Sequence, residues 1–348
     1  MRKGLVARIG RFALMAGLLS AISGPGHGQG TAPIAIDFTL DRPVDGAAAP
    51  FFMALRTGHF HDAGLKVTIK PGSSSNDTIA RVAAGQSQIG LADINALIRF
   101  RDDPDAAPVK AVFVLSNAAP YAIIARKSRG IATVADLPGK TLGVAAGDLT
   151  IRLWPAVAAR NGVRPDALKQ QAIGAAVREP MLVAGQIDAV TGFSFLSAVN
   201  LRNRGIPADD LTVLRFSDYG CAAYGAALIV NPQFAADHPE AVRAFVRATL
   251  AALNQTLRNP AAAIDKVMPE MKESSRDIEL ARLRAMIDHD VLTAEVRHNG
   301  LGGIDADRFA LALDQIGADF KFRSRPTLAD IFDDRFLPPA AQRRQATD

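Results

Sequence analysis

Short apolar runs alternate with amphipathic stretches along the first two thirds of the chain. Runs rich in Val, Ile, Ala and Phe that end at Gly, Pro or Asn are typical of buried strands. The stretches between them carry apolar residues at helical spacing and begin with Pro or with side chains that cap helices. We expect strands at 34–40, 66–70, 88–92, 109–115, 121–126, 141–145, 188–192, 212–216 and 223–230, and helices that include 50–60, 78–84, 151–161 and 179–184.

The pattern changes after residue 231, where long amphipathic helices follow one another without strands. We expect helices at 239–258, 260–268, 275–293 and 305–320. The earlier alternation of strands with helices predicts an α/β fold built on a largely parallel sheet.

The strand–helix pattern falls into two blocks, and the helical segment that follows has two possible places. It could form an independent all-α domain, or it could pack on the first block. We favour the second arrangement because the segment begins with the strand at 223–230, which needs a sheet to join. The chain would then cross between lobes twice, near 117–121 and near 221–224. The expected division is a discontinuous first lobe, a second lobe and a disordered tail: 31–118 plus 223–340, 119–222 and 341–348.

The first 30 residues have the three-part composition of a secretory signal peptide. Four Lys and Arg residues and no acidic residue lie within 1–11, an apolar run occupies 12–22, and small polar residues fill 23–30. The apolar run is much shorter than the about 20 residues that a membrane-spanning helix needs. We expect this segment to be removed on export. The mature protein would be periplasmic and without a lipid anchor, because Cys221 lies far from the cleavage region.

Composition narrows the function further. The 348 residues carry a formal net charge of +5, but four of the cations belong to the expected signal peptide. The remaining chain is nearly neutral, so we expect no nucleic-acid partner. With 49% hydrophobic and 22% charged residues, the chain is not intrinsically disordered. A single cysteine excludes an intrachain disulfide framework and a metal site built from several cysteines.

Motifs of common catalytic sites are incomplete in this sequence. The segment 139–141 (GKT) lacks the first glycine of a P-loop, and 192–195 (GFSF) lacks the last glycine of a nucleophile elbow. A lone Cys221 between apolar neighbours is more typical of packing than of catalysis. His59 and His61 follow a helix, where exposed polar residues are common. We therefore expect no catalytic residue, no metal and no cofactor.

Three turns between a strand and a helix are candidate ligand sites, at 41–49, 72–77 and 147–150. In open α/β sheets, ligands bind beyond the carboxyl ends of the strands, where helix N-termini offer free N–H groups. Helix capping alone would explain the polar residues of any one turn. Three such turns on two lobes that face one cleft favour a binding site.

Several short motifs also occur in a fixed order over most of the chain after residue 30. They are 40–41 (LD), 49–54 (APFFMA), 58–60 (GHF), 62–65 (DAGL), 84–86 (AGQ), 89–90 (IG) with Asp93, 136–144 (DLPGKTLGV), 218–220 (DYG), 224–225 (YG) and 239–245 (PEAVRAF). In this order the sequence resembles the substrate-binding proteins of ABC importers of the nitrate/sulfonate/taurine type, including the branch related to thiamine-pyrimidine precursor proteins.

The resemblance implies a two-lobed periplasmic binding protein fold of type II, with the ligand cleft between the lobes and two hinge crossings. It implies a monomeric receptor that closes on a small organic solute, either a sulfonate, a carboxylate or a heterocyclic metabolite. The receptor would deliver this solute to the membrane permease of an ABC importer and its ATPase. Carried over by position, the ligand-binding residues are Asp41, Arg42, Asp45, Ser73, Ser74, Ser75, Asp93, Gly147, Asp148, Thr150, Arg178, Phe193, Tyr219 and Tyr224.

The sequence departs from the pyrimidine-binding branch at two positions. That branch usually has an aromatic residue after the aspartate of the first strand and a histidine further along the loop, whereas Arg42 and Ala48 stand here. This difference disfavours a pyrimidine ligand. Arg42 could bind a carboxylate or sulfonate through two hydrogen bonds, or could pair with Asp41 and Asp45. Two alternative functions are an enzyme of thiamine-pyrimidine biosynthesis on the same fold and a sensor ectodomain.

Overall fold

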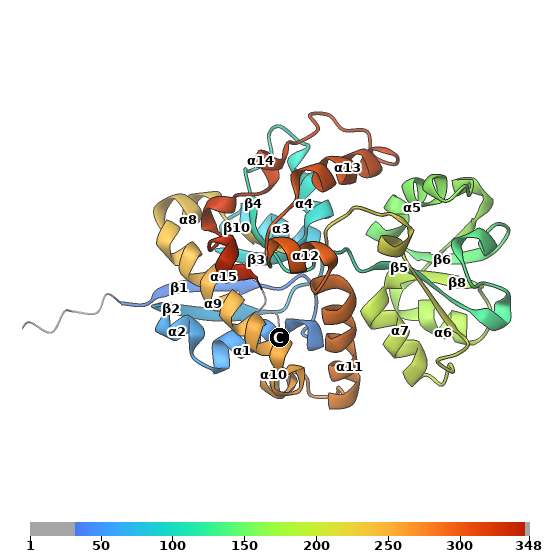
Figure 1. The fold of residues 1–348 in the computed structure, drawn as a ribbon, viewed down its shortest axis with the longest axis horizontal. Helices are drawn as coiled ribbons and strands as arrows, with labels where there is room; N and C mark the ends of the chain where they lie inside the picture. The colour runs from blue at the N-terminus through green and yellow to red at the C-terminus, as the bar shows by residue number, and fades with distance from the viewer. Residues whose placement is uncertain (1–31, 345–348) are drawn as a thin grey trace, which may run out of the picture. The chain divides into compact units, whose positions relative to one another are not determined.

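The computed structural model of the protein describes residues 32–344, which form two five-stranded sheets surrounded by helices (Figure 1). The signal peptide predicted at residues 1–30 lies outside the described residues. None of the helices in the described range is both long and apolar enough to cross a membrane. We call the first sheet with the elements around it the first lobe, and the second sheet with its helices the second lobe.

The first sheet combines four strands from the start of the chain with one strand that returns later. Its strands are β1 (Ile34–Thr39), β2 (Leu65–Lys70), β3 (Ile89–Asp93), β4 (Lys110–Val114) and β10 (Ala226–Val230), in the order β2-β1-β3-β10-β4. β1 runs parallel to β2 and β3, whereas β10 is antiparallel to both β3 and β4. The returning strand therefore lies inside the sheet, between two strands of the first block.

The second sheet repeats this topology. Its strands are β5 (Tyr121–Arg126), β6 (Thr141–Ala145), β7 (Lys169–Ile173), β8 (Ala189–Phe193) and β9 (Leu211–Arg215), in the order β7-β6-β8-β5-β9. β5 is antiparallel to β8 and β9, and β6 is parallel to β7 and β8. The predicted α/β class is confirmed, but each sheet is mixed. The strand that enters a sheet from the other lobe arrives in the opposite direction to its neighbours.

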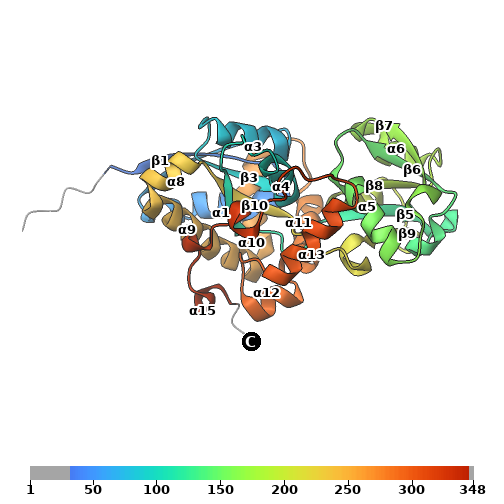
Figure 2. The same cartoon turned by 90° about the horizontal axis from the view of Figure 1, so that it is seen from above.

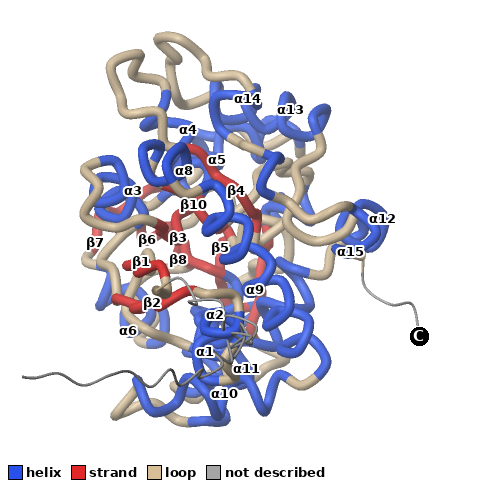
Figure 3. The backbone as a smooth tube through the Cα atoms, turned by 90° about the vertical axis from the view of Figure 1, so that its left-hand side faces the viewer, coloured by secondary structure: helices blue, strands red, loops and turns tan. Residues whose placement is uncertain are grey.

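Helices surround both sheets, as the blue segments around the red strands in Figure 3 show. In the first block they are α1 (Ala49–Arg56), α2 (His59–Asp62), α3 (Ser75–Ala83) and α4 (Ile94–Arg101). The second lobe contains α5 (Leu149–Arg160), α6 (Arg178–Val183) and α7 (Ser194–Asn203). After β10 follow α8 (Pro232–Asp237), α9 (Pro239–Arg258), α10 (Pro260–Val267), α11 (Arg276–Met286), α12 (Ala294–Asn299), α13 (Ala306–Gly317), α14 (Leu328–Ile331) and α15 (Ala340–Arg343).

The chain passes between the sheets at residues 115–120 and 220–225, and hydrogen bonds join these two crossings. Gly225 N donates to Ser116 O at 2.8 Å, and Ala119 N donates to Ala223 O at 3.1 Å. The crossings therefore lie side by side rather than as separate linkers. Residues 223–225 belong to a crossing, so β10 begins later than the strand predicted at 223–230.

The C-terminal helices pack mainly on the first lobe. α9 lies against α1 and α2, and Figure 2 shows α9 beside α1. The Phe245 ring of α9 stacks on Phe60 at a centroid distance of 4.8 Å and meets Phe38 edge-on at 5.3 Å. Two of these helices also reach the second lobe, because α11 packs against α7 and α13 against α5.

Part of the predicted tail is ordered. Residues 341–343 belong to α15, and Leu301 N donates a hydrogen bond of 2.9 Å to Arg343 O. The Arg343 guanidinium also donates to Pro338 O and Leu301 O. The prediction of a disordered tail from residue 341 is wrong for this stretch because backbone and side-chain hydrogen bonds hold it; residues 345–348 lie outside the described residues.

Truncation of the Phe245 ring tests the α9 core. Phe245→Ala should lower the free energy of unfolding by about 3–5 kcal/mol, because the ring is fully buried among other phenylalanines. Denaturant titration followed by circular dichroism measures this change. Leu311→Ala is the control, since that side chain is 41% exposed, and it should change stability by no more than about 0.5 kcal/mol. Similar losses in both variants would contradict the assignment.

Candidate functional site

A pocket lies where the loop after β1 faces the end of β8 and the first crossing. Its polar lining includes Asp41, Arg42, Asp45 and Asp93 from the first lobe, and Phe193 enters from the second lobe. The space that remains is small, with a cavity volume of only about 20 Å³. The pocket is therefore shared by both lobes and nearly filled by side chains.

Arg42 fills much of this pocket and connects the two lobes. Its Nε and Nη2 donate to the two carboxylate oxygens of Asp41 at 3.0 and 2.9 Å, which forms a bidentate ion pair. The guanidinium lies 5.0 Å from the ring centroid of Phe193 and 5.8 Å from that of Phe195, within range of cation–π attraction. Arg42 Nη1 is buried and has no hydrogen-bond partner.

Local structure explains why Asp41 and Arg42 occupy this place. They follow β1 at its carboxyl end, beside the end of β3. Ser75, at the start of α3, donates to Asp41 Oδ2 at 3.3 Å and accepts from Asp93 N at 3.0 Å. Gly72 in the preceding turn packs against the Leu40 carbonyl, so that a Cβ would come within 1.8 Å of its oxygen. Only glycine lets this turn approach the end of β1.

The charges in the pocket perturb one another. Burial lowers the pKa of Arg42, but the carboxylates of Asp41, Asp45 and Asp93 outweigh this effect and hold the pKa above its ordinary value. Burial raises the pKa of Asp45, although Arg42 opposes the shift. Burial likewise raises the pKa of Asp93, against hydrogen bonds from Tyr121 and Asn95. Arg42 therefore stays charged, whereas protonation of the two aspartates is favoured by the site.

Asp93 joins the two lobes directly. Its Oδ1 accepts from Asn95 N and Nδ2, both at 2.8 Å, and caps α4. Its Oδ2 accepts from the Tyr121 hydroxyl at 2.5 Å, and Tyr121 is the first residue of β5 in the second sheet. Asn95 Nδ2 also donates to Tyr224 O in the second crossing. Both Asp93 oxygens already have partners, so this residue positions the crossings as well as lining the pocket.

The candidates from the second lobe form a separate cluster. Asp148 Oδ1 accepts from Thr150 N at 2.9 Å and caps α5, while its Oδ2 accepts from Arg178 Nη1 at 2.8 Å and from Thr191 Oγ1. Gly147 before them has φ +74°, a left-handed conformation that favours glycine. Asp148, Thr150 and Arg178 are not among the residues that line the pocket.

The other predicted serines and tyrosines also lie outside the pocket lining. Ser74 Oγ accepts from Asp77 N and caps α3, and Ser73 interacts with Asp77. Tyr219 ends a short 3-10 helix in the second lobe, where its carbonyl accepts from an asparagine side chain. Of the fourteen candidates, the structure brings Asp41, Arg42, Asp45, Asp93 and Phe193 together around one space.

Several residues that line the pocket were not among the predicted candidates. Phe195, Ser116 and Pro120 follow strands and could have been found by extending the rule for strand ends to the crossings. Met286 ends α11, far along the chain, and reaches the pocket only because the C-terminal segment packs back on the first lobe. The position of Met286 in the lining depends on tertiary packing, which the hydrophobic periodicity of the sequence does not predict.

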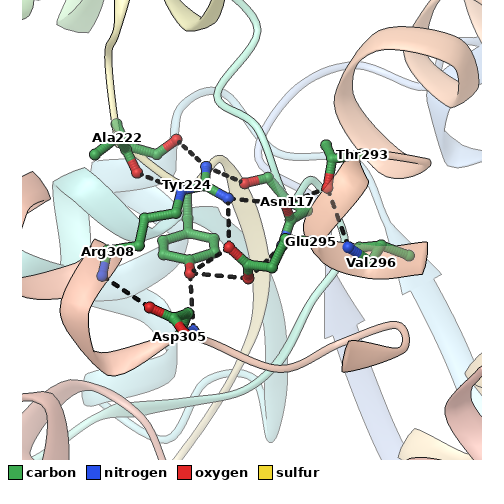
Figure 4. Close-up of polar contacts among 9 residues, drawn as sticks. Asn117, Ala222, Tyr224, Thr293, Glu295, Val296, Asp305 and Arg308 are labelled. Atoms are coloured by element: carbon green, nitrogen blue, oxygen red, sulfur yellow. Dashed lines mark hydrogen bonds and ion pairs between the residues drawn. The ribbon is translucent and has the colours of Figure 1, made fainter. Parts of the chain in front are cut away.

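Tyr224 belongs to a polar network at the crossings (Figure 4). Its hydroxyl donates to Glu295 Oε1 at 2.9 Å and accepts from Asp305 N at 2.8 Å. Burial raises the pKa of this hydroxyl, against the effect of Arg308. The Arg308 guanidinium lies 4.0 Å from the Tyr224 ring centroid. The ring and hydroxyl are thus engaged with the C-terminal segment beside the second crossing.

Arg308 uses all its donors to hold both crossings. Nε donates to Ala222 O at 2.9 Å, and Nη2 donates to Ala223 O at 3.2 Å and to Asn117 O at 2.7 Å. Nη1 donates to Asn117 Oδ1 at 2.8 Å and to Glu295 Oε2 at 2.9 Å. A planar guanidinium has five N–H groups, so none is left without a partner. One side chain from α13 therefore ties the two crossings to each other.

Other titratable groups that could carry chemistry have different surroundings. Burial raises the pKa of the Cys221 thiol to about 11, which keeps it protonated at neutral pH. Within residues 32–344, no three His, Cys, Asp or Glu side chains lie together in a way that could hold a metal ion.

Asp290 is buried near Arg42 and Arg215, and its Oδ2 has no hydrogen-bond partner.

Comparisons with known proteins place the chain in a family. The profile described as NMT1/THI5 like matches residues 46–263. The chain belongs to this family. A riboflavin-binding protein RibY from Chloroflexus aurantiacus is 29% identical over 67% of the chain and 66% of its own length. A 4-amino-5-hydroxymethyl-2-methylpyrimidine phosphate synthase from Schizosaccharomyces pombe is 25% identical over 70% of the chain and 72% of its own length. The match thus spans about two thirds of these relatives.

Solved structures support the fold of this NMT1/THI5-like protein. The alkanesulfonate-binding protein SsuA from Xanthomonas axonopodis has a TM-score of 0.62 at 15% identity, covering 86% of the chain and 98% of its own. The periplasmic aliphatic sulphonate binding protein SsuA from Escherichia coli has a TM-score of 0.64 at 15% identity, covering 91% and 93%. The predicted two-lobed α/β fold of periplasmic binding proteins is confirmed, and at these identities the likeness shows the fold alone.

The buried Asp290 carboxyl predicts a pH-dependent stability. Burial raises its pKa in the folded state well above the ordinary value of about 3.9, so the folded protein holds the proton more tightly than the unfolded chain. Stability should fall as the pH rises above about 4. Asp290→Asn removes this loss and should increase the free energy of unfolding by about 1–3 kcal/mol at pH 7 but little at pH 4.

Denaturant titrations at the two pH values measure this difference. Asp288→Asn is the matched control, because Asp288 is exposed in the same turn. An equal effect of Asp290→Asn at both pH values would show that the carboxyl does not carry the predicted desolvation penalty.

The Arg308 network predicts a large effect from a single substitution. Arg308→Met keeps an aliphatic stem but removes the guanidinium that donates to the crossing carbonyls and balances the charge of Glu295. The two charged side chains are 21% and 17% exposed, so the expected loss of stability is about 2–3 kcal/mol, at or below the lower end of the range for fully buried pairs. Thermal and denaturant unfolding measure it. The exposed Arg297→Met on α12 serves as control, and a loss no greater than in that variant would refute the role of Arg308.

Proposed function

We propose that this protein is an extracytoplasmic solute receptor that binds one small organic molecule between its lobes and delivers it to the permease of an ABC importer. The observation that carries the proposal is the pocket around Arg42, which both lobes line beside two paired crossings. The proposed lobes are residues 31–118 with 223–340, and residues 119–222. Similarity to binding proteins for alkanesulfonates and riboflavin supports the receptor function.

Ligand entry in this proposal requires the lobes to separate. Pockets for organic ligands have volumes of about 300–1,000 Å³, whereas Arg42, Phe193 and Phe195 leave little room here. Movement about the two crossings would withdraw Phe193 and Phe195 from Arg42 and open the space. Closure of the lobes around a bound solute is the hinge motion of such receptors. The Arg308 network would hold the crossings together while the lobes move.

The proposed cellular place and partners follow from the receptor function. Residues 1–30 would act as the export signal, and the mature protein would work in the periplasm as a monomer. The resemblance to a periplasmic sulphonate-binding protein supports this location. Its macromolecular partner would be the permease with its ATPase, which receives the solute when the lobes open.

An enzyme is the second candidate, because several curated relatives are named as 4-amino-5-hydroxymethyl-2-methylpyrimidine phosphate synthases. The pocket offers Asp45 and Asp93 as groups with raised pKa values, a feature that catalytic acids share with structural carboxyls. In the receptor proposal these groups bind and position, and the solute leaves unchanged. Recovery of the bound molecule therefore separates the two functions.

Ligand binding by purified mature protein tests the receptor function. A thermal-shift screen against flavins, pyrimidines, sulfonates and carboxylates should find a solute that stabilises the protein, and calorimetry should give one site per chain. Phe193→Ala should weaken that solute at least about tenfold, because it removes an aromatic wall of the pocket. The exposed Val177→Ala serves as control and should bind like the wild type.

Two outcomes would refute the receptor function. Mass spectrometry should recover the solute chemically unchanged after long incubation, so conversion to a product would favour the enzyme. Fractionation of cells should place the mature chain in the periplasm, so a cytoplasmic location would also contradict the proposal.

A further inference from the structure

We propose that the pocket selects an uncharged, flat solute that carries a hydrogen-bond acceptor, and that it rejects sulfonates and carboxylates. The reason is that the chain's own aspartates already occupy the positions where an anion would bind. This inference rests on the proposed receptor function, and it names the class of solute.

The cation in the pocket lining is already neutralised. Arg42 gives two of its three nitrogens to Asp41 in a bidentate pair, which is the geometry in which an arginine would otherwise hold a sulfonate or carboxylate. The Arg42 side chain is 19% exposed and that of Asp41 is 6% exposed, so water does little to weaken the pair. A ligand anion would have to displace Asp41 and leave its buried carboxylate without the cation that balances it.

A second arginine–aspartate pair, in the second lobe and outside the pocket lining, shows the same arrangement. Arg178 Nη1 donates to Asp148 Oδ2 at 2.8 Å, with side-chain exposures of 21% and 8%. Asp148 also accepts from Thr150 N, so it occupies the first turn of α5. Free N–H groups at a helix N-terminus are a common anion site. Here both the helix terminus and the arginine beside it are occupied by a single aspartate.

Two more helix starts beside the pocket are capped in the same way. Asp93 accepts from Asn95 N at the start of α4. Asp45 accepts from Ala47 N at the start of the 3-10 helix Gly46–Ala48. Together with Asp41, these residues place three acidic side chains against Arg42 in the pocket lining. Arg42 is the cation of the pocket lining, and Asp41 balances its charge. This holds whether Asp45 and Asp93 are protonated or not.

Arg42 keeps one donor for a ligand. Arg42 Nη1 is buried and has no partner, so an incoming carbonyl oxygen or aromatic nitrogen can accept its hydrogen bond without bringing charge. Phe193 and Phe195 already present their rings to the planar guanidinium, at 5.0 and 5.8 Å, and offer the same stacking surface to a flat ligand. The solute class is therefore a planar uncharged molecule with an acceptor at its edge.

Releasing the arginine of the pocket lining should create the missing anion site. Asp41→Asn frees the charge of Arg42. Calorimetric titration with benzenesulfonate should give at least about tenfold tighter binding to this variant than to the wild type, the gain expected from a new charge-assisted pair. Asp37→Asn, whose exposed carboxylate pairs with Lys70 at the sheet edge, is the matched control and should gain nothing.

A comparison of isosteres in the wild type gives the second measurement. Benzenesulfonamide should bind more tightly than benzenesulfonate, and nicotinamide more tightly than nicotinate. Tighter binding of the anion of either pair to the wild type would overturn the inference while leaving the receptor function intact. Failure of the folded Asp41→Asn variant to gain sulfonate binding would also overturn it. If that variant does not fold, the comparison of isosteres in the wild type still decides, and neither result depends on which natural solute the receptor screen finds.

Discussion

The double crossing between the lobes is the constraint on which the rest of the structure depends. Two segments, each of which joins one sheet to the other, must stay adjacent. Arg308 meets this requirement by donating to carbonyls of both crossings, with Glu295 balancing its charge. The crossings place Ser116 and Pro120 beside the loop after β1, so that residues of both lobes line one pocket.

The charges of the pocket follow from this geometry. Because the lobes meet at the carboxyl ends of β1, β3 and β8, several residues that begin helices lie near one another. Asp45 and Asp93 cap such helices, and burial makes their negative charge costly unless Arg42 lies between them. Arg42 is thus needed to stabilise the lining itself. The same residue cannot at once neutralise Asp41 and provide full charge to an anionic ligand.

Local periodicity predicts most of the fold but only part of the site. α9 has the predicted bounds 239–258, because a proline begins it and an asparagine ends its apolar pattern. The helix expected at 275–293 instead ends at Met286 and continues as the π-helical turn Ile287–Val291. Asp41 and Arg42 follow from the rule for strand ends. Arg178 pairs with Asp148, 30 residues earlier in the chain. Such pairing between distant segments cannot be predicted from the spacing of residues in the sequence.

The similarity to sulfonate-binding proteins carries no information about the charge of this protein's ligand. At 15% identity it establishes the arrangement of two sheets and a cleft, and a fold does not determine what binds to it. In the pocket lining, Asp41 takes the place beside Arg42 that an anion would need. A receptor of this fold could therefore change from anionic to neutral solutes by gaining one carboxylate per arginine, without any change in its strands or crossings.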